Sequence, residues 1–441
     1  MPNSVTIKEK IRPFNKHIEI SGDKSISIRW VLLSSLATGV SSAKNLLISE
    51  DVIASINAIK KLGIKVKKYK NTFKIFGKGI NGYKYKKNLK INLQNSGTLG
   101  RLLLGLLINT PYPIKFIGDK SLSRRDFKRV TDPLSKFGAK FNLKNNKNLP
   151  LTIQGSQNLK PILYKEKRGS AQCKSAAIFG GMRTEGETLI KAKKSRNHTE
   201  LLAKYLKLPI KIQSKKNFDL IRINKVKKIN KLNYKIPSDI SSGAFFIVLT
   251  ALTSNSKLTI KNVNINSSRI GIIKILKKMG VKINFINNKF YKGEKIADIK
   301  IKSPKILKAI NCPSKLNSGA IDEFLIIFLV AAKAKGVSYF KNLEELNQKE
   351  SPRLIWGAKI LKEMGIKSTV TKKSIKIYGN PYLKINKKII IKNFLKDHRV
   401  FMTCIIAALS FENKKSWQIH DKDSIRTSFP NFFKIINKIK K

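Results

Sequence analysis

The chain has 441 residues, of which 41% are hydrophobic, so it is long enough for two or three domains with sizeable cores. Its apolar runs at 244–252 and 324–332 are far shorter than the roughly 18 residues of a membrane-spanning helix. Cys173, Cys312 and Cys404 lie far apart without CxxC spacing, which argues against a metal site and a disulfide framework. We expect no membrane span, no signal peptide and a reducing cytoplasm.

The formal net charge is +65, from 91 Lys and Arg against 26 Asp and Glu. Such a charge is compatible with a basic nucleic-acid-binding protein. The lysines are scattered along the whole chain, however, and many alternate with Ile and Asn, which share A/T-rich codons. We therefore favour biased composition over a specific nucleic-acid partner. The charge still predicts attraction for small anions.

The first elements place cations and hydroxyl groups together. Residues 17–20 (HIEI) alternate like a strand, and residues 30–39 (WVLLSSLATG) are typical of a helix. Between them, residues 21–30 (SGDKSISIRW) offer Lys24, Ser25 and Arg29.

A repeated phrase divides the chain. The pattern hydrophobic–Gly–hydrophobic–Lys follows an amphipathic helix at Gly63, Gly138, Gly280 and Gly365, with Pro209 in the place of glycine once. Glycine there suits a left-handed helix C-cap, and the residues after it suit a strand. The spacings of 75, 71, 71 and 85 residues, with a last helix at 432–440, predict six α/β units in two halves of three. The crossover between the halves is expected near residue 237.

Three stretches of the first half place small polar residues and a cation at the start of an apolar helix. They are residues 21–30, residues 94–107 with Asn95, Gly97 and Arg101, and residues 169–181 with Ser170, Gln172 and Lys174. Helix N-termini bind anions, but Ser and Asn also simply cap helices. Each stretch alone favours capping, whereas three in successive units suggest a site for phosphates or carboxylates. None matches a P-loop or a GxGxxG motif, so no nucleotide is proposed.

The second half has carboxylates beside very apolar helices. These are Asp322 and Glu323, Glu350 between Lys349 and Arg353, and Asp397 near Arg399. Such acids invite shifted pKa values and general acid/base chemistry. The alternative is a set of ion pairs at helix N-termini.

The chain resembles the 5-enolpyruvylshikimate-3-phosphate synthase family through ten motifs. They occur in the same order as in that family and extend from about residue 18 to residue 433. They read GDKSISIR, NSGTLGR, GDKSLSRR, SAQCKSA, SRNHTE, SDISSGAFF, IDE, KESPRL, DHR and SFPNF. The resemblance implies the two-domain enolpyruvyl transferase fold, an α/β inside-out barrel with three βαβαββ-like repeats in each domain. The implied domains are residues 22–237, and residues 1–21 plus 238–441, with the active site in the cleft between them.

The same resemblance implies the reaction. Phosphoenolpyruvate donates its enolpyruvyl group to the 5-hydroxyl of shikimate 3-phosphate and releases phosphate, by addition to a tetrahedral intermediate and elimination. This step of the shikimate pathway leads to chorismate and the aromatic amino acids. It uses no metal and no organic cofactor, and the family suggests a cytoplasmic monomer.

The implied site residues follow the motifs. Lys24, Asp322 and Glu350 are expected to be catalytic, with Asp322 accepting the 5-hydroxyl proton and Glu350 acting at the methylene carbon. The residues expected to bind shikimate 3-phosphate are Lys24, Ser25, Arg29, Ser170, Ala171, Gln172, Arg196, Asp322 and Lys349. Those expected to bind phosphoenolpyruvate are Lys24, Asn95, Gly97, Arg125, Gln172, Arg353 and Arg399, with Lys422 as a weaker candidate one residue off register.

Some positions depart from the family pattern. Ser21 stands in place of proline, Ile28 in place of histidine, Asp126 in place of proline, and Asn347 and Pro352 in place of an arginine and an aspartate. An inactive homologue therefore stays an alternative. Another is enolpyruvyl transfer to a UDP-linked amino sugar, although the loop of residues 118–127 lacks the cysteine usual in that relative.

Overall fold

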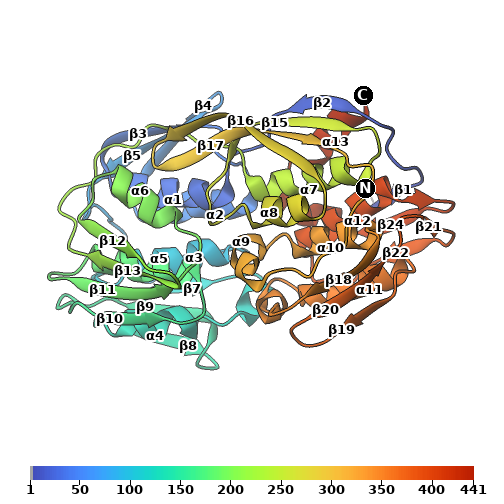
Figure 1. The fold of residues 1–441 in the computed structure, drawn as a ribbon. Coiled ribbons are helices and arrows are strands. Elements are labelled where there is room, and N and C mark those ends of the chain that lie inside the picture. Colours follow the sequence, from blue (N-terminus) through green and yellow to red (C-terminus); the bar gives the residue numbers. More distant parts are fainter. Residues whose placement is uncertain (1–2) are drawn as a thin grey trace. The chain divides into compact units, whose positions relative to one another are not determined.

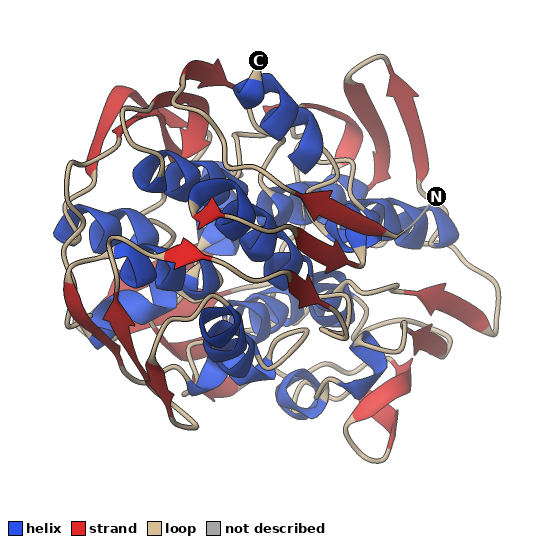
Figure 2. Ribbon diagram, turned by 90° about the vertical axis from the view of Figure 1, so that its right-hand side faces the viewer, coloured by secondary structure: helices blue, strands red, loops and turns tan. Residues whose placement is uncertain are grey.

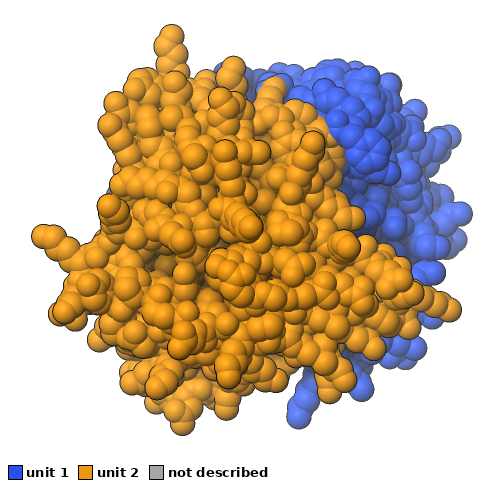
Figure 3. All heavy atoms as spheres, turned by 90° about the vertical axis from the view of Figure 1, so that its left-hand side faces the viewer, with its two compact units in different colours: residues 1–21, 237–290, 295–441 blue, residues 22–236, 291–294 orange. Residues whose placement is uncertain are grey.

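The computed structural model describes residues 3–441 and separates into two compact units, coloured in Figure 3. Unit 1 consists of the chain up to Ser21, Pro237–Phe290 and Lys295–Lys441. Unit 2 consists of Gly22–Ile236 together with the short segment Tyr291–Glu294. Among residues 3–441, no helix has the length and apolar character needed to cross a bilayer.

Unit 2 contains three four-stranded sheets that share one topology. In each, the first strand is parallel to the second, and the last two strands are antiparallel to their neighbours. The first sheet has, in order, β14 (Tyr234–Lys235), β3 (Thr38–Lys44), β5 (Thr72–Lys78) and β4 (Lys65–Tyr69). The second has β6 (Leu89–Asn92), β7 (Ile114–Ile117), β9 (Asn148–Gln154) and β8 (Lys140–Lys144). The third has β10 (Leu163–Glu166), β11 (Thr188–Lys193), β13 (Phe218–Ile223) and β12 (Ile210–Ser214).

The core of unit 2 is built on α1 (Lys24–Ser35), α3 (Gly97–Leu106) and α5 (Ala171–Gly181). Apart from their first one or two residues, these helices are buried on every side, as apolar helices without a polar face require. The axes of α3 and α5 approach closely, because a Cβ at Gly105 would lie 2.3 Å from the Ala176 carbonyl oxygen. The other helices of unit 2 are α2 (Glu50–Lys61), η1 (Leu122–Arg124), α4 (Lys128–Ser135) and α6 (His198–Tyr205).

Within residues 3–441, unit 1 contains one four-stranded sheet, two three-stranded sheets and one strand pair. Its strands in sheet order are β16 (Lys282–Tyr291), β17 (Glu294–Lys302), β15 (Lys257–Asn264) and β2 (Asn15–Ile18); β18 (Gly336–Phe340), β20 (Ile375–Gly379) and β19 (Ser368–Val370); β1 (Ser4–Ile7), β24 (Trp417–His420) and β22 (Ile389–Ile391); and the pair β21 (Lys384–Ile385) and β23 (Glu412–Asn413). The strands β1 and β2 come from the N-terminal segment, so unit 1 is discontinuous in sequence.

Three buried helices again form the centre of unit 1 (Figure 1). They are α7 (Ile240–Leu252), α10 (Phe324–Lys333) and α12 (His398–Ser410). Around them lie α8 (Gly271–Lys278), η2 (Ser314–Leu316), α9 (Asn317–Ala320), η3 (Glu344–Gln348), α11 (Arg353–Glu363), η4 (Lys422–Thr427) and α13 (Phe432–Lys440). Figure 2 shows helices and strands mixed throughout, as the predicted α/β class requires.

The repeated helix ends have the predicted left-handed conformation. The φ angles are 85° at Gly63, 115° at Gly138, 94° at Gly280 and 83° at Gly365. In the third copy Lys207 takes this conformation, with φ of 54°, two residues before the proline of the phrase. The predicted repeats of helix, turn and antiparallel strands are thereby confirmed, and so is the last helix.

Two boundaries differ from the sequence prediction. The strand expected at residues 17–20 is β2 and ends at Ile18. The helix expected from residue 30 begins six residues earlier, at Lys24, because the Asp23 side chain caps it by accepting from the Ile26 N–H at 2.9 Å. Lys24, Ser25 and Arg29 therefore lie on the first two turns of α1 and not on a preceding loop.

Candidate active site

In unit 2, Lys24 is the first residue of α1, with about a quarter of its side chain exposed. Its Nζ lies 2.9 Å from Oδ2 of Asp51, which stands in the first turn of α2. The side chain of Asp51 is nearly buried, so this carboxylate fixes the direction of the lysine. Asp51 was not expected from the sequence, since only the fold brings α2 to the start of α1.

Arg29 lies more than one turn further along α1 and is only 3% exposed. Its Nε donates to Thr199 Oγ1 at 2.7 Å, and its Nη2 donates to Ser175 Oγ at 3.0 Å. Its Nη1 donates to the carbonyl of Ser25 at 3.0 Å. Burial lowers the pKa of the Arg29 guanidinium to about 10, against the opposing charge of Glu200, so the group stays a cation at neutral pH.

The second stretch joins Asn95 to Arg125. The Arg125 Nη2 donates to Asn95 Oδ1 at 2.7 Å, and the Asn95 amide donates to Asp119 Oδ2 at 2.7 Å. A Cβ at Gly97 would lie 2.9 Å from Arg101 Nη1 and 3.3 Å from Arg125 Nη1. A side chain at residue 97 would therefore press on both guanidinium groups.

The third stretch carries Gln172 in the first turn of α5. Its Oε1 accepts from Arg101 Nη1 at 2.6 Å, and its Nε2 donates to Thr98 Oγ1 at 2.8 Å. Both partners belong to α3, so residues of the second stretch fix the orientation of the Gln172 side-chain amide. Burial lowers the pKa of Arg101 to about 10, which still leaves it charged.

Each of the three helices is also capped by a side chain. Asp23 caps α1, Ser96 accepts from the Leu99 N–H at 3.3 Å, and Ser170 accepts from the Cys173 N–H at 3.3 Å. The capping interpretation is therefore confirmed for all three. Cations stand on the same turns or beside them, so anion binding at these helix starts stays a prediction.

In unit 1, the centre of the candidate site is Arg353 at the start of α11, which is 2% exposed. Its Nη1 donates to Asp322 Oδ1 at 3.3 Å, and its Nη2 donates to Glu350 Oε2. Its Nε donates to Asp397 Oδ2 at 2.9 Å. One guanidinium thus holds three carboxylates that come from separate parts of the sequence.

The pKa shifts follow from this arrangement. Burial alone would raise the pKa of Asp397, but the charge and hydrogen bonds of Arg353 lower it below its ordinary value. Burial would lower the pKa of Arg353, and Asp397, Glu350 and Asp322 raise it well above its ordinary value. The charged forms of both groups are therefore favoured. Asp397 also caps α12 by accepting from the Arg399 N–H at 2.9 Å.

Two more cations lie beside this group, one on the Asp322 carboxylate and one on the Asp322 backbone carbonyl and Glu323. The Lys349 Nζ lies 3.2 Å from Asp322 Oδ1. The Arg399 Nη1 donates to the Asp322 carbonyl at 2.7 Å and lies 3.5 Å from Glu323 Oε1. The ion-pair alternative read from the sequence is thus confirmed, while the acid/base role of these carboxylates stays a prediction.

This group can take part in proton transfer. Asp322 and Glu350 are both partly accessible, with side chains 15% and 19% exposed, and both contact the same arginine. A carboxylate beside a hydroxyl group can accept its proton, and the cations can hold an anionic substrate. Lys422 lies apart from these contacts, with its Nζ 5.7 Å from the centre of the Phe433 ring.

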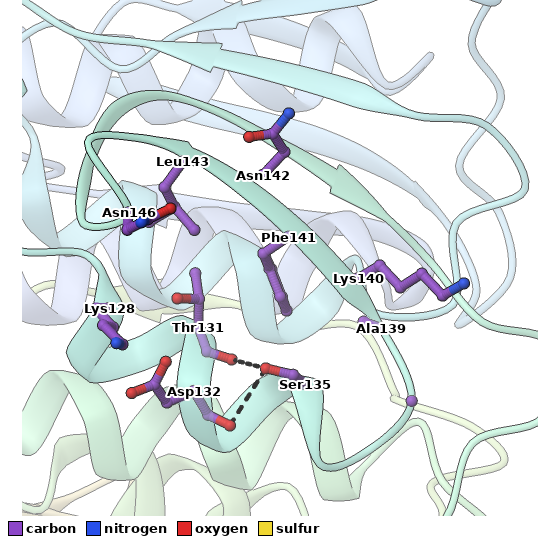
Figure 4. Close-up of a pocket in the computed structure, with 11 residues that line it drawn as sticks. Lys128, Thr131, Asp132, Ser135, Ala139, Lys140, Phe141, Asn142, Leu143 and Asn146 are labelled. Carbon is purple, nitrogen blue, oxygen red and sulfur yellow. Dashed lines mark hydrogen bonds between the residues drawn. The ribbon is translucent and has the colours of Figure 1, made fainter.

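A separate cavity of about 670 Å³ lies between α4 and β8 in unit 2 (Figure 4). Its lining includes Lys128, Asp132, Lys140 and Phe141. None of the predicted substrate-binding residues lines it.

Comparisons with known proteins agree with one another. Residues 8–436 match the family model of EPSP synthase (3-phosphoshikimate 1-carboxyvinyltransferase). A 3-phosphoshikimate 1-carboxyvinyltransferase of Ruthia magnifica subsp. Calyptogena magnifica is 39% identical over 423 residues, which is 96% of this chain and 94% of that protein. The same enzyme of Petrotoga mobilis is 36% identical over 443 residues and covers both chains fully.

Solved structures match over nearly the whole chain. The EPSP synthase from Acinetobacter baumannii has a TM-score of 0.86 and 33% identity, over 99% of this chain and 98% of that chain. The enolpyruvyl transferase NikO from Streptomyces tendae has a TM-score of 0.76 over 100% of this chain and 98% of that chain, at 13% identity. The latter likeness concerns the fold alone.

Proposed function

Because the chain belongs to the EPSP synthase (3-phosphoshikimate 1-carboxyvinyltransferase) family, we propose that the two groups of side chains described above bind and activate its two substrates. The chain is a transferase of the shikimate pathway, and it moves the enolpyruvyl group of phosphoenolpyruvate to shikimate 3-phosphate. Family and relatives favour this acceptor over a UDP-linked amino sugar.

The observation that carries the assignment of roles is the fork of Arg353 on Asp322 and Glu350. Asp322, as the carboxylate, accepts the proton of the 5-hydroxyl as its oxygen adds to C2 of phosphoenolpyruvate, and Glu350, as the carboxylic acid, delivers its proton to C3. The product of this addition is a tetrahedral phosphoketal. Glu350 then removes a proton from the new methyl group while the C2–O bond to phosphate breaks. Asp322 passes its proton to the departing phosphate. Two carboxylates held by one cation suit such paired transfers.

The binding roles use the cations. Lys24 contacts both substrates, and Arg29 and Arg196 hold shikimate 3-phosphate with Ser25, Ser170, Ala171, Gln172 and Lys349 around it. Arg125, Arg353 and Arg399 hold phosphoenolpyruvate beside Asn95 and Gly97. Guanidinium forks suit the planar oxygens of carboxylate and phosphate groups, and they neutralise two anions that otherwise repel each other. We predict that both groups line one cleft between the two domains. The predicted domains are those given above, residues 22–237 and residues 1–21 plus 238–441.

Phosphate release tests the reaction. Purified protein with phosphoenolpyruvate is expected to release phosphate only when shikimate 3-phosphate is added, and not with a UDP-linked amino sugar. Silence with shikimate 3-phosphate would mean either that the substitutions around Asn347 and Pro352 have cost the activity or that the acceptor has changed. Release with the UDP-linked amino sugar would decide for the changed acceptor.

Substitution of the proposed base tests the mechanism. Asp322→Asn keeps the shape of the side chain but cannot accept the proton, so kcat is expected to fall about 10²–10⁴-fold with a small change in KM. Glu363→Gln is the matched control, since Glu363 pairs with Lys387 away from this group. An unchanged kcat in D322N would show that Asp322 is not the base.

Further properties are proposals from the family alone. We expect a monomer that acts in the cytoplasm and has no specific nucleic-acid partner. The molecular mass of the purified protein in solution tests whether it is a monomer. DNA binding that disappears at physiological salt would support the absence of a specific nucleic-acid partner.

A further inference from the structure

The turn of the β16–β17 hairpin belongs to a different compact unit from the rest of the two strands. Its residues Tyr291–Glu294 group with unit 2, while the flanking strand residues group with unit 1. The Tyr291 hydroxyl accepts from the Lys235 N–H at 2.8 Å. The Tyr291 ring packs edge-on against Tyr234, with centroids 5.3 Å apart.

The two middle residues of the turn are held as well. The Lys292 ammonium donates to the Asn233 carbonyl, and it lies 5.6–5.9 Å from the ring centres of Tyr291, Tyr234 and Tyr205. Such a cage of aromatic faces attracts a cation. Gly293 has φ of 87°, and a Cβ there would lie 2.7 Å from the Leu201 carbonyl oxygen on α6. The turn is thus fitted closely to unit 2.

The fourth residue, Glu294, ends the turn with a buried contact. Its Oε1 lies 2.6 Å from Nδ1 of His198, and both side chains are fully buried. A buried carboxylate must be paired to be tolerated, so this short contact fixes Glu294 and the imidazole relative to each other. His198 is the first residue of α6.

The next two residues of α6 hold the proposed substrate-binding elements. Thr199 Oγ1 accepts from Arg29 Nε at 2.7 Å and lies 2.7 Å from Ser175 Oγ. Glu200 Oε1 lies 2.7 Å from the Lys174 Nζ, and both side chains are buried. The first turn of α6 therefore connects the hairpin turn, α1 and α5.

Arg196 stands two residues before His198, in the segment that enters α6. After burial, which is the main cause, the charge of Arg196 contributes to lowering the pKa of Arg29. The two cations therefore repel each other electrostatically, and a bound anion would relieve that repulsion.

We propose that Glu294 is a positioning residue for the acceptor substrate. Through His198, Glu294 fixes the position of the first turn of α6. That turn orients the Arg29 side chain through Thr199, and it positions the preceding segment, which carries Arg196. The proposal rests on the proposed function, in which Arg29 and Arg196 hold shikimate 3-phosphate. Glu294 itself touches no substrate.

The test compares Glu294→Ala with Glu294→Gln by steady-state kinetics. E294A removes the carboxylate that contacts His198 Nδ1, so KM for shikimate 3-phosphate is expected to rise about tenfold, with kcat and KM for phosphoenolpyruvate within about twofold. E294Q keeps an oxygen that accepts from the ring N–H, and it is expected to restore most of the affinity. Equal rises in both KM values, or no rise in E294A, would overturn the proposal.

Asp298→Asn is the matched control on the same hairpin. Asp298 lies on β17, pairs with Lys261 at 2.8 Å and accepts from the Asn262 N–H, so D298N loosens the hairpin without touching α6. If D298N raised KM for shikimate 3-phosphate as much as E294A, the effect would come from the hairpin in general, and the proposal would fail. Should E294A not fold, Glu294→Asp carries the test. It shortens the side chain by one methylene and so draws the carboxylate away from His198, and an unchanged KM for shikimate 3-phosphate would overturn the proposal.

Arg196→Ala separates this proposal from the proposed function. If wild-type turnover requires shikimate 3-phosphate but R196A and Arg29→Ala leave its KM unchanged, the assigned binding roles are wrong. If these two variants raise that KM and E294A does not, the binding roles stand and only the positioning role of Glu294 is wrong.

Discussion

Arg353 is nearly buried, and its planar guanidinium reaches three carboxylates that one ammonium group cannot reach together. Arg353→Lys would leave at least one of these acids buried and poorly paired. The free energy of unfolding is expected to fall by about 3–5 kcal/mol, measured by urea denaturation. Arg222→Lys is the control, because Arg222 pairs with Glu187 at the surface, where such a change costs about 0–1 kcal/mol. Equal losses in the two variants would contradict the prediction.

The lowered pKa of Asp397 predicts a pH dependence of stability. A carboxyl whose folded pKa lies below its unfolded value, about 3.9, contributes stability that is present above that value and is lost as pH falls through the folded pKa. Asp397→Asn is therefore expected to be clearly less stable than wild type at pH 7, and the difference should shrink below about pH 4. Unfolding curves at several pH values measure it. A difference that stays constant to pH 2 would argue against an ionised Asp397 paired with Arg353.

The charged site residues could be read from their motifs, but their partners could not. Arg29 meets Thr199 across 170 positions, and Arg353 meets Asp397 across 44. Such pairs depend on how helices pack, which local patterns do not encode. Thr199 lies in the SRNHTE motif, but nothing in that motif shows that its hydroxyl contacts Arg29. Glu294 lies outside all ten motifs, so no local signal marks it.

At the scale of elements, the capped helix starts of unit 2 carry both stability and chemistry. Ser96→Ala removes the oxygen that accepts from the Leu99 N–H, and it is expected to lower the free energy of unfolding by about 1 kcal/mol. Ser49 offers a matched control, since it stands at the N-cap of α2 without a side-chain cap hydrogen bond. Ser49→Ala should therefore cost less, as denaturant titration would reveal. A larger loss in S49A than in S96A would refute the capping argument.

The repeat and the fold class could be predicted because glycine marks left-handed helix ends in four of the copies. The early start of α1 could not, because residues 25–28 (SISI) alternate like a strand. The Asp23 cap and the packing of α1 in the core overrule that local pattern. Similarly, no pattern foretold that a lysine, Lys207, would replace glycine at the third helix end.

At the scale of the whole molecule, the formal net charge of +65 acts in two opposite ways. It attracts anionic substrates, and it destabilises the folded chain by repulsion between like charges. Raising NaCl from about 20 to about 300 mM shortens the screening length to below about 10 Å. We expect a higher Tm and higher KM values for both substrates, measured by thermal melts and phosphate release. A Tm that falls with NaCl would show that favourable ion pairs outweigh the repulsion.

The pairing of β1 with β24 has a consequence during synthesis. Ser4 lies opposite His420, so β1 can form its native pairing only after β24 has been synthesised. At about 5–20 residues per second, a ribosome needs roughly 20–80 s to make the intervening chain. Through that time β1 has no native neighbour in its sheet, while Gly22–Ile236, an uninterrupted run, can already assemble most of unit 2. A nascent-chain chaperone that shields this strand would therefore benefit the newborn protein more than one acting on the finished chain.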